Sequence, residues 1–371
     1  MSSGSGIEWT DATWNPVTGC TRVSAGCDHC YAVTMTHRLE KMSAGKKTRD
    51  GEEWKSAREV AVHEKYAGLT VLNPRGERHF NGQVRCHEDA LAIPLGWKKP
   101  RNVFVNSMSD LFHKDVPFAF IDQVFAVMAL SPQHTFQVLT KRPDRMAEYL
   151  HLPPKNRAFK TWEEAGAAFG VEGWKGPRNR HTGALAMPLP NVWLGTSVEN
   201  QATADERIPH LLRCPAAVRF ISAEPLLGPV DFDAIKVSPA PGFFGSPLQW
   251  HHRGECHKRE DIKYPKLDWV IVGGESGPGA RPCDVAWIRS LVAQCKAAGT
   301  ACFVKQLGRR FVIRNDRMSE WPRDGDVLIY DADQFGPGTY QGDDLVCELS
   351  DPKGGDPAEW PEDLRIRELP R

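Results

Sequence analysis

The sequence lacks several features that would assign it to a class of proteins at once. It has no run of about eighteen apolar residues, which excludes a membrane-spanning helix on ordinary criteria. It has no net charge, because 47 basic and 47 acidic residues cancel, so the chain as a whole is not attracted to nucleic acid or membranes. Residues 1–14 contain neither an apolar core nor a basic leader and do not resemble a signal peptide. We therefore expect a soluble, cytoplasmic protein with no membrane partner, in which any site for a polyanion is local.

Cysteine, in contrast, is concentrated near the start of the chain. Cys20, Cys27 and Cys30 form a C-x6-C-x2-C motif on a glycine-containing stretch. The reducing interior of a cell favours metal or redox chemistry for clustered cysteines. Thiolates at this spacing fit one side of a [4Fe–4S] cluster, where they bind three irons and leave the fourth without a protein ligand. We expect each of the other seven cysteines to behave as a small, buried hydrophobic side chain. They are at positions 86, 214, 256, 283, 295, 302 and 347.

Zinc is the alternative metal for the same motif. Cys27 and Cys30 also match the C-x2-C pair of a zinc knuckle, and His29 or His37 would complete a tetrahedral site. A structural zinc site usually has a second pair of ligands at short range, and no such pair follows here. The motif alone therefore favours the cluster and leaves zinc as the second choice.

Short apolar, β-branched runs alternate with helical patterns along the chain. The runs are 103–105, 135–139, 192–194, 218–221, 269–272 and 302–304, and clear helical patterns are at 121–130 and 287–298. This alternation is typical of a parallel sheet built from βαβ units. With one more strand just before or within the cysteine loop, the chain has fewer units than a closed eight-stranded barrel. The sequence therefore predicts an α/β fold, an open, partial parallel α/β barrel of about six βα units.

Three longer stretches interrupt this repeat, at 40–80, 153–190 and 236–266, and fit lids or partner surfaces. We expect a barrel over residues 1–310 with these insertions, followed by an irregular C-terminal extension, 311–371, in which the pattern loses its period. The third insertion contains a second group of metal-ligand types, although its composition favours a surface loop. That group is His251, His252, Cys256 and His257.

Polar residues follow the predicted strands. Ligands bind at the carboxyl ends of the strands in parallel α/β folds, so these residues are expected to share one polar pocket. Each of them taken alone also fits a helix cap or an ion pair. The candidates are Ser107, Ser109, Asp110, Lys141, Ser197, Glu199, Glu224, Gly273, Gly274 and Glu275.

A cysteine triad ahead of such a partial barrel resembles the radical S-adenosylmethionine superfamily. More closely, the chain resembles a phage and prophage family of three-cysteine proteins of unassigned activity, from about Ile7 to Gly308 without the insertions. The superfamily's common spacing is C-x3-C-x2-C, whereas the first gap here is six residues and His29 stands where an aromatic residue is usual. The segments that carry the resemblance are Gly19-Cys20…Cys30-Tyr31-Ala32, Asn106–Phe112, Leu139–Pro143 and Gly273–Gly277.

The resemblance implies a [4Fe–4S] cluster held by Cys20, Cys27 and Cys30, S-adenosylmethionine as the second cofactor, and an external low-potential electron donor. Reductive cleavage of S-adenosylmethionine would yield methionine and a 5′-deoxyadenosyl radical that takes hydrogen from the substrate.

Roles for the strand-end residues also follow from the resemblance. Gly273, Gly274 and Glu275 would bind the amino-acid part of S-adenosylmethionine, and Lys141 or Arg142 its carboxylate. Glu224 and Asp110, the latter together with His113, are the candidate catalytic residues, as substrate ligands or proton acceptors. The candidates for the ribose hydroxyls are Ser107, Ser109, Ser197 and Glu199.

The substrate is less constrained than the cofactors. Local cations at Lys141, Arg142, Arg145 and the 175–181 interval fit the phosphates of a nucleic acid or nucleotide. The phage context that the resemblance implies favours modification or repair of a base. A peptide or small metabolite also fits. The alternative function is a zinc- or iron–sulfur-binding protein that binds nucleic acid or a partner without cleaving S-adenosylmethionine.

Overall fold

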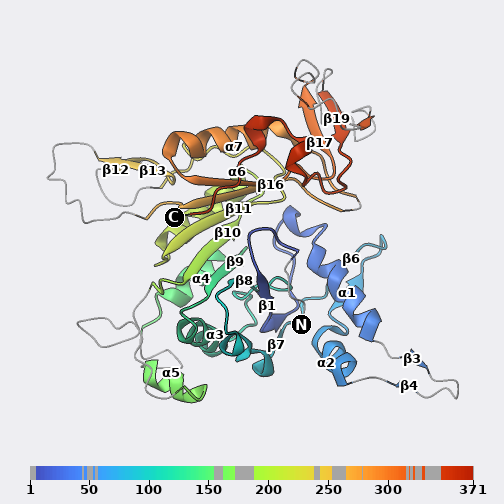
Figure 1. Ribbon diagram of the computed structural model, residues 1–371, viewed down its shortest axis with the longest axis vertical. Helices are drawn as coiled ribbons and strands as arrows, with labels where there is room; N and C mark the ends of the chain where they lie inside the picture. Colours follow the sequence, from blue (N-terminus) through green and yellow to red (C-terminus); the bar gives the residue numbers. More distant parts are fainter. Residues whose placement is uncertain are drawn as a thin grey trace. The chain divides into compact units, whose positions relative to one another are not determined.

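The computed structural model of the chain, shown in Figure 1, describes residues 6–43, 46–47, 53–54, 57–153, 162–171, 188–237, 243–252, 265–277, 279–314, 317, 321, 328–330 and 344–370. The chain divides into two compact units. The first unit comprises Met1–Leu194 and Cys214–Ala217, and the second comprises Gly195–Arg213 and Val218–Arg371.

The main element is a parallel sheet of seven strands in the order β1-β8-β9-β10-β11-β14-β16. All six predicted runs lie in its strands, and β1 is the strand expected ahead of the cysteine loop. Strands β1 and β16 are the two ends of the order, so the sheet is open, which confirms the predicted partial parallel α/β barrel. The strands are β1 (Ala12–Trp14), β8 (Asn102–Val105), β9 (Thr135–Thr140), β10 (Val192–Ser197), β11 (Val218–Ala223), β14 (Trp269–Gly273) and β16 (Ala301–Gln306).

Two helices of the first unit contribute to its core. Helix α3 (Phe118–Leu130) contains the predicted helix 121–130 and is almost entirely buried. Helix α4 (Pro143–Leu150) begins with a proline, which fits the first turn because its missing N–H would have no partner there. The Tyr149 hydroxyl of α4 donates a 2.8 Å hydrogen bond to Asp122 Oδ1 of α3, so this buried carboxylate is paired.

Strand β14 of the second unit is apolar along its whole length because it is buried on both faces. All five residues of β14 are buried, as expected for a parallel strand covered on both faces. Helix α7 (Val285–Ala298) contains the predicted helix 287–298. It begins after Asp284, whose side chain accepts a hydrogen bond from the Ala286 N–H, and ends at Gly299 in the left-handed conformation. Helix α6 (Gln201–Arg213) follows β10 in the chain.

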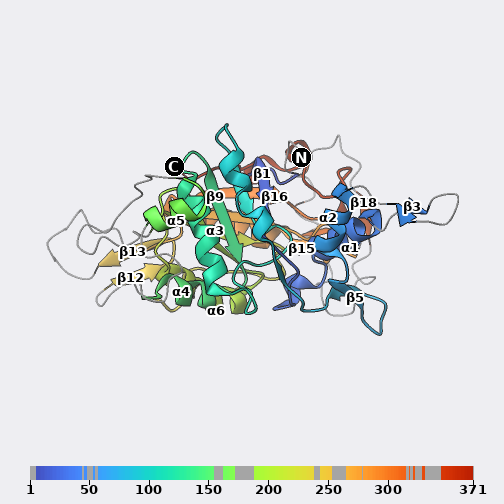
Figure 2. The ribbon, with the colours of Figure 1, turned by 90° about the horizontal axis from the view of Figure 1, so that it is seen from below.

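Helices α1 (Tyr31–Ser43) and α2 (Ala57–Tyr66) lie side by side, as Figures 1 and 2 both show, and α2 lies within the first predicted insertion. Short antiparallel pairs accompany them. These are β2 (Val17–Thr18) with β7 (Arg85–Cys86), β3 (Lys46–Lys47) with β4 (Glu53–Trp54), and β5 (Thr70–Leu72) with β6 (Arg78–Phe80).

The other two insertions are described in part. The second contains α5 (Trp162–Ala168), and the third contains the hairpin of β12 (Phe243–Ser246) and β13 (Gln249–His252). His251 and His252 therefore lie in a strand. The predicted cation interval 175–181, together with Cys256 and His257, lies outside the described residues.

The C-terminal region differs from the irregular extension expected for residues 311–371. Strands β15 (Cys283–Asp284), β17 (Phe311–Arg314), β19 (Asp344–Glu348) and β18 (Leu328–Tyr330) form a four-stranded sheet in that order. Strands that pair in this sheet are far apart in the chain, as in the pairing of Phe311 with Cys347. No local periodicity in the sequence therefore predicts them. Short 3-10 helices, η7 (Pro357–Glu359) and η8 (Glu362–Leu364), follow. Among all described helices, none is long and apolar enough to cross a membrane.

Candidate functional site

The three cysteines lie on one loop of the first unit, between β2 and α1. Gly19 enters the loop with a φ of 84°, and a Cβ at this position would collide with the carbonyl oxygen of Gln83, so only glycine fits. The 3-10 helix η1 (Ala25–Cys27) turns the loop, and α1 begins directly after Cys30. All three thiols are partly buried and free of disulfides. The local sequence therefore gathers three unoxidised thiols on a short segment.

These thiols lie within electrostatic reach of one another. Burial, aided by the Asp110 carboxylate, raises the pKa of Cys20 to about 12, although Arg142 opposes the shift and Cys30 adds to it. Burial also raises the pKa of Cys30, against the lowering effect of the Lys141 ammonium and together with Cys27. Without a bound cation, Cys20 and Cys30 therefore favour the neutral thiol.

The donor set is of the kind that iron–sulfur clusters and thiolate zinc sites use. His37, one of the two histidines predicted as a zinc ligand, has its Nδ1 3.7 Å from Glu40 Oε2 on α1. His29, the other, is exposed. In the part of the chain that the structure describes, no group of three or more His, Cys, Asp or Glu side chains is placed to hold a metal ion.

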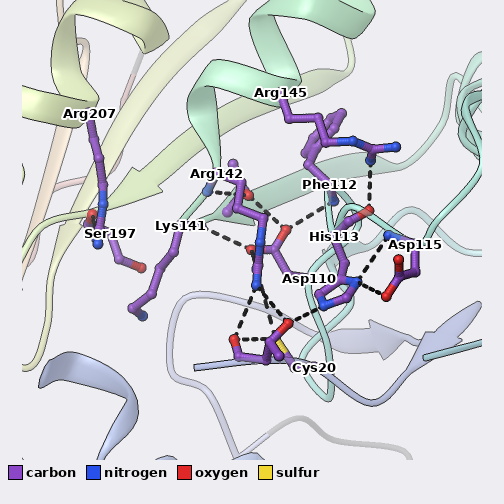
Figure 3. A network of polar contacts seen from close by, with 12 residues as sticks. Cys20, Asp110, Phe112, His113, Asp115, Lys141, Arg142, Arg145, Ser197 and Arg207 are labelled. Atoms are coloured by element: carbon purple, nitrogen blue, oxygen red, sulfur yellow. Dashed lines mark hydrogen bonds and ion pairs between the residues drawn. The ribbon is translucent and has the colours of Figure 1, made fainter. Parts of the chain in front are cut away.

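Asp110, predicted as a catalytic carboxylate, is buried and accepts hydrogen bonds from four donors, as Figure 3 shows. Its Oδ1 accepts hydrogen bonds from Thr140 Oγ1 at 2.7 Å and from the Phe112 N–H at 2.9 Å. Its Oδ2 accepts from Arg142 Nη1 at 2.8 Å and from the Lys141 N–H at 3.1 Å. The carboxylate therefore joins the loop after β8 to the turn between β9 and α4.

Arg142 continues this network to the cysteine loop. Besides Asp110, its guanidinium donates to the Thr21 carbonyl at 3.1 Å, to Thr21 Oγ1 at 3.4 Å and to Cys20 Sγ at 3.9 Å. Burial opposes the charge of Arg142, but Asp110 and Cys20 together raise its pKa above the ordinary value. The side chain is thus a fixed cation beside the first cysteine.

His113 contacts the same loop, also through the Thr21 hydroxyl. The Asp115 N–H donates to His113 Nδ1 at 3.2 Å, so the proton of the neutral ring lies on Nε2 and is donated to Thr21 Oγ1. Burial, with Arg142 acting in the same direction, lowers the pKa of His113 and favours the neutral ring. His113 therefore orients Thr21.

Lys141 and Arg145, both predicted to meet anions, differ in their surroundings. The side chain of Lys141 points away from Asp110 in Figure 3, and its charge partly offsets the burial that raises the pKa of Cys30. Arg145 donates to the carbonyls of His113 and Val116 at 2.7 and 2.8 Å and lies over the Phe118 ring. The charge of Lys141 thus acts on the cysteine loop, whereas Arg145 binds the backbone of the loop that carries His113.

Two of the three serines predicted to bind ribose, Ser107 and Ser109, use their hydroxyls within the protein. Ser107 Oγ donates to Asn15 Oδ1 at 3.1 Å, and Ser109 Oγ donates to the Val17 carbonyl at 2.8 Å. The Tyr31 hydroxyl, one residue after Cys30, donates to the Ser107 carbonyl. These contacts attach the strand end of β8 to both ends of the cysteine loop.

Three of the predicted strand-end carboxylates lie in the second unit, and each is paired with a cation. Glu199 forms a buried ion pair of 3.0 Å with Arg207, which also donates to the Ser197 carbonyl. Glu275 accepts from Arg281 Nε at 2.9 Å and Nη2 at 2.6 Å. The third carboxylate, Glu224, accepts from Lys305 Nζ at 2.7 Å and from Gln306 Nε2 at 3.1 Å.

Gly273 and Gly274 pack against the end of β16. A Cβ on Gly274 would collide with the Leu307 carbonyl, and one on Gly273 would lie 3.3 Å from the Gln306 backbone. Close packing therefore accounts for both glycines without a cofactor. No local pattern predicts Thr21, Thr140, Arg207, Arg281 or Lys305 as the partners of these groups, because each pairing depends on the fold.

An open pocket of about 540 Å³ lies beside the cysteine loop in the first unit. Arg85, one of its two cations, donates to the carbonyls of Glu64 and Ala67 at 2.8 and 2.7 Å. Lys114, the other, is exposed. The pocket is lined by Thr21, Asn81, Gly82, Gln83, Val84, Arg85, Lys114 and Asp115.

Comparison with known proteins identifies a family but no reaction. A family model described as a protein of unknown function (DUF5131) matches residues 4–328. No curated protein and no solved structure matches the chain significantly.

Proposed function

Because the chain belongs to the DUF5131 family, whose description assigns no reaction, we propose its function from the site itself. The proposal is a radical S-adenosylmethionine enzyme that depends on a [4Fe–4S] cluster. The observation that carries it is the set of three free, partly buried thiols on one loop at the end of a partial parallel α/β barrel. Thiolates in this number would leave one iron of a cubane open to a second cofactor.

Cys20, Cys27 and Cys30 would hold the cluster. With S-adenosylmethionine bound, the cluster and an external low-potential donor would supply radical chemistry for hydrogen abstraction from a substrate. The protein's contribution is to hold the thiols, orient the cofactors and exclude water. The partial burial of the thiols and the packed β8 loop behind them support this role.

Binding of S-adenosylmethionine is assigned to strand-end residues. We assign the cofactor carboxylate to Lys141, whose positive charge acts on the buried Cys30 thiol. Glu275 of the second unit remains the candidate for the cofactor amine. We assign Gly273 and Gly274 to the packing of this turn instead, because the Gly274 N–H donates to the Gln306 carbonyl and the Gly273 carbonyl accepts from the Leu226 N–H. Glu199 is a weaker ribose ligand than the sequence suggested, because Arg207 holds its carboxylate in a buried ion pair. Ser197 keeps its assignment, since Arg207 donates to its backbone carbonyl and not to its hydroxyl.

We assign different roles to the two predicted catalytic carboxylates, Asp110 and Glu224. Asp110 accepts four hydrogen bonds from the protein, so we assign it to positioning Arg142. Glu224, which is partly exposed and held by Lys305, is the candidate to contact substrate as a ligand or proton acceptor.

A nucleotide or a nucleic-acid base is the proposed substrate. The support is the pocket beside Thr21, whose volume suits a small ligand and whose lining includes Arg85, Lys114 and Gln83. Cations of this kind position phosphates, while amides hydrogen-bond to base edges.

Metal analysis of anaerobically purified protein tests the proposal. We expect about four irons and four sulfides per chain, with the broad absorption of a cluster and little zinc. About one zinc without iron would overturn the proposal and favour a zinc-containing binding protein, for which salt-dependent affinity for nucleic acid is the next measurement.

A further inference from the structure

Arg142 is the strongest unassigned feature near the cysteines. Its Nη1 atom lies between two acceptors, 2.8 Å from Asp110 Oδ2 and 3.9 Å from Cys20 Sγ. The side chain is only 15 % exposed, and Asp110 is 8 % exposed, so water screens their interaction weakly. A guanidinium held this way presents its remaining donors in a fixed direction.

Those remaining donors reach the cysteine loop. Arg142 Nη2 donates to the Thr21 carbonyl at 3.1 Å and to Thr21 Oγ1 at 3.4 Å. Thr21 is the residue directly after Cys20, and its hydroxyl also accepts from His113. The backbone beside the first cysteine is therefore fixed from two sides by residues of the β8 and β9 loops.

A lysine at this position would not reproduce the arrangement. The guanidinium uses two nitrogens for four acceptors on two separate segments, the Asp110 carboxylate and residues 20 and 21. An ammonium is a single point of charge and cannot span both with the same geometry. The arrangement thus depends on arginine and not on positive charge alone.

We propose that Arg142, oriented by Asp110, is a positioning residue that fixes Cys20 for cluster binding and raises the reduction potential of the bound cluster by donating to the Cys20 sulfur. This inference rests on the proposed function, since it concerns the same cluster. Hydrogen bonds and positive charge at a ligating sulfur stabilise the reduced, more negative state. Arg142 would thereby make the transfer of an electron from an external donor easier.

The test compares the unchanged protein with R142Q and R142K, all purified anaerobically with the cluster in place. The readouts are iron content, the electron paramagnetic resonance spectrum of the reduced cluster and its midpoint potential. R289Q is the matched control, because Arg289 of α7 is a partly buried arginine in an ion pair of 2.7 Å with Asp363, among residues of the second unit.

We expect R142Q to bind iron and to be about tenfold harder to reduce, which is about 59 mV for a one-electron couple. R142K keeps the charge beside Asp110 and should fold even if R142Q does not, and we expect a smaller negative shift in its potential. R289Q should match the unchanged protein. A merely structural role for Arg142 would lower the yield of cluster but leave the potential unmoved.

Two results would overturn the inference, and they are distinguishable. A cluster with the same midpoint potential in R142K, R142Q and the unchanged protein would overturn the role of Arg142 alone. Absence of a cluster from the unchanged protein would overturn the proposed function and this inference with it.

Discussion

Arg142 Nη1 lies 2.8 Å from Asp110 Oδ2 and 3.9 Å from Cys20 Sγ, so that a single guanidinium connects a buried carboxylate to the first cysteine of the loop. Two residues separated by 32 positions in the chain thus form an ion pair behind the proposed cluster site. The pair accounts for Asp110 after β8 and Arg142 after β9 without requiring either to face a ligand.

Replacing Asp110 with Ala should destabilise the protein strongly. The change leaves the Arg142 guanidinium and three further donors without their acceptor in a poorly hydrated position. We expect a loss of about 3–5 kcal/mol in the free energy of unfolding, measured by urea denaturation. The exposed Asp115, replaced by Ala, is the control and should change stability by about 0.5 kcal/mol or less. Equal stability of D110A and D115A would show that the network contributes nothing.

Single replacement of Cys20, Cys27 or Cys30 with Ala should abolish most of the bound iron. Each removal leaves a cubane with two protein ligands, which is too few to hold it stably. C86A is the matched control, since Cys86 is an exposed free cysteine outside the loop. Iron content and visible absorption after anaerobic purification are the measurements. Full iron in all three loop variants would refute the assignment of these ligands.

Replacement of Glu275 with Ala should weaken binding of S-adenosylmethionine by about tenfold while the iron content stays unchanged, because a charged hydrogen bond contributes about 1.5–3 kcal/mol. R281A separates this role from a structural one, since it breaks the same ion pair but keeps the carboxylate. Calorimetric titration of both variants is the measurement. If E275A and R281A bind the cofactor equally well, Glu275 does not belong to the site.

Gly274→Ala should destabilise the protein through backbone overlap alone. The added Cβ would meet the Leu307 carbonyl and come within 2.9 Å of the Gly308 Cα, and neither atom belongs to a flexible side chain. We expect a loss of about 1–3 kcal/mol by thermal or urea unfolding. Gly96→Ala is the control, because nothing lies within 4 Å of its added Cβ. A G274A protein as stable as G96A would contradict the packing described for this turn.

His87 should make stability depend on acid pH. Burial, together with Lys65 and Arg85 and against Asp89, lowers the pKa of His87 to about 4 from an ordinary 6.5. The neutral ring is therefore preferred in the folded state, so the stabilisation is complete above about pH 6.5 and is lost as the pH falls toward about 4.

The H87Q variant tests this dependence, because its amide can still donate to Thr18 Oγ1 as the histidine ring does. Urea unfolding at several pH values should show a shallower loss of stability between pH 6.5 and 4 in H87Q than in the unchanged protein. Exposed His79, replaced by Gln, should leave the slope as it is. Identical slopes for all three proteins would exclude His87 as the source.

Much of the barrel was predictable because its strands are continuous apolar runs, such as Trp269 to Val272, that need no partner to be recognised. The cysteine motif was equally visible as a local spacing. The C-terminal sheet was missed because its strands are short and pair across long separations, as Phe311 does with Cys347. The Asp110 network was missed for the same reason, since polar residues at a strand end look alike until the fold gives each its partner.

The most direct test of the central claim is formation of 5′-deoxyadenosine. Anaerobic protein with its cluster is mixed with dithionite and S-adenosylmethionine, and the product is measured by mass spectrometry alongside the C27A variant. Our account predicts 5′-deoxyadenosine from the unchanged protein and none from C27A. An iron-loaded protein that yields no 5′-deoxyadenosine, or the same amount in both samples, would contradict it.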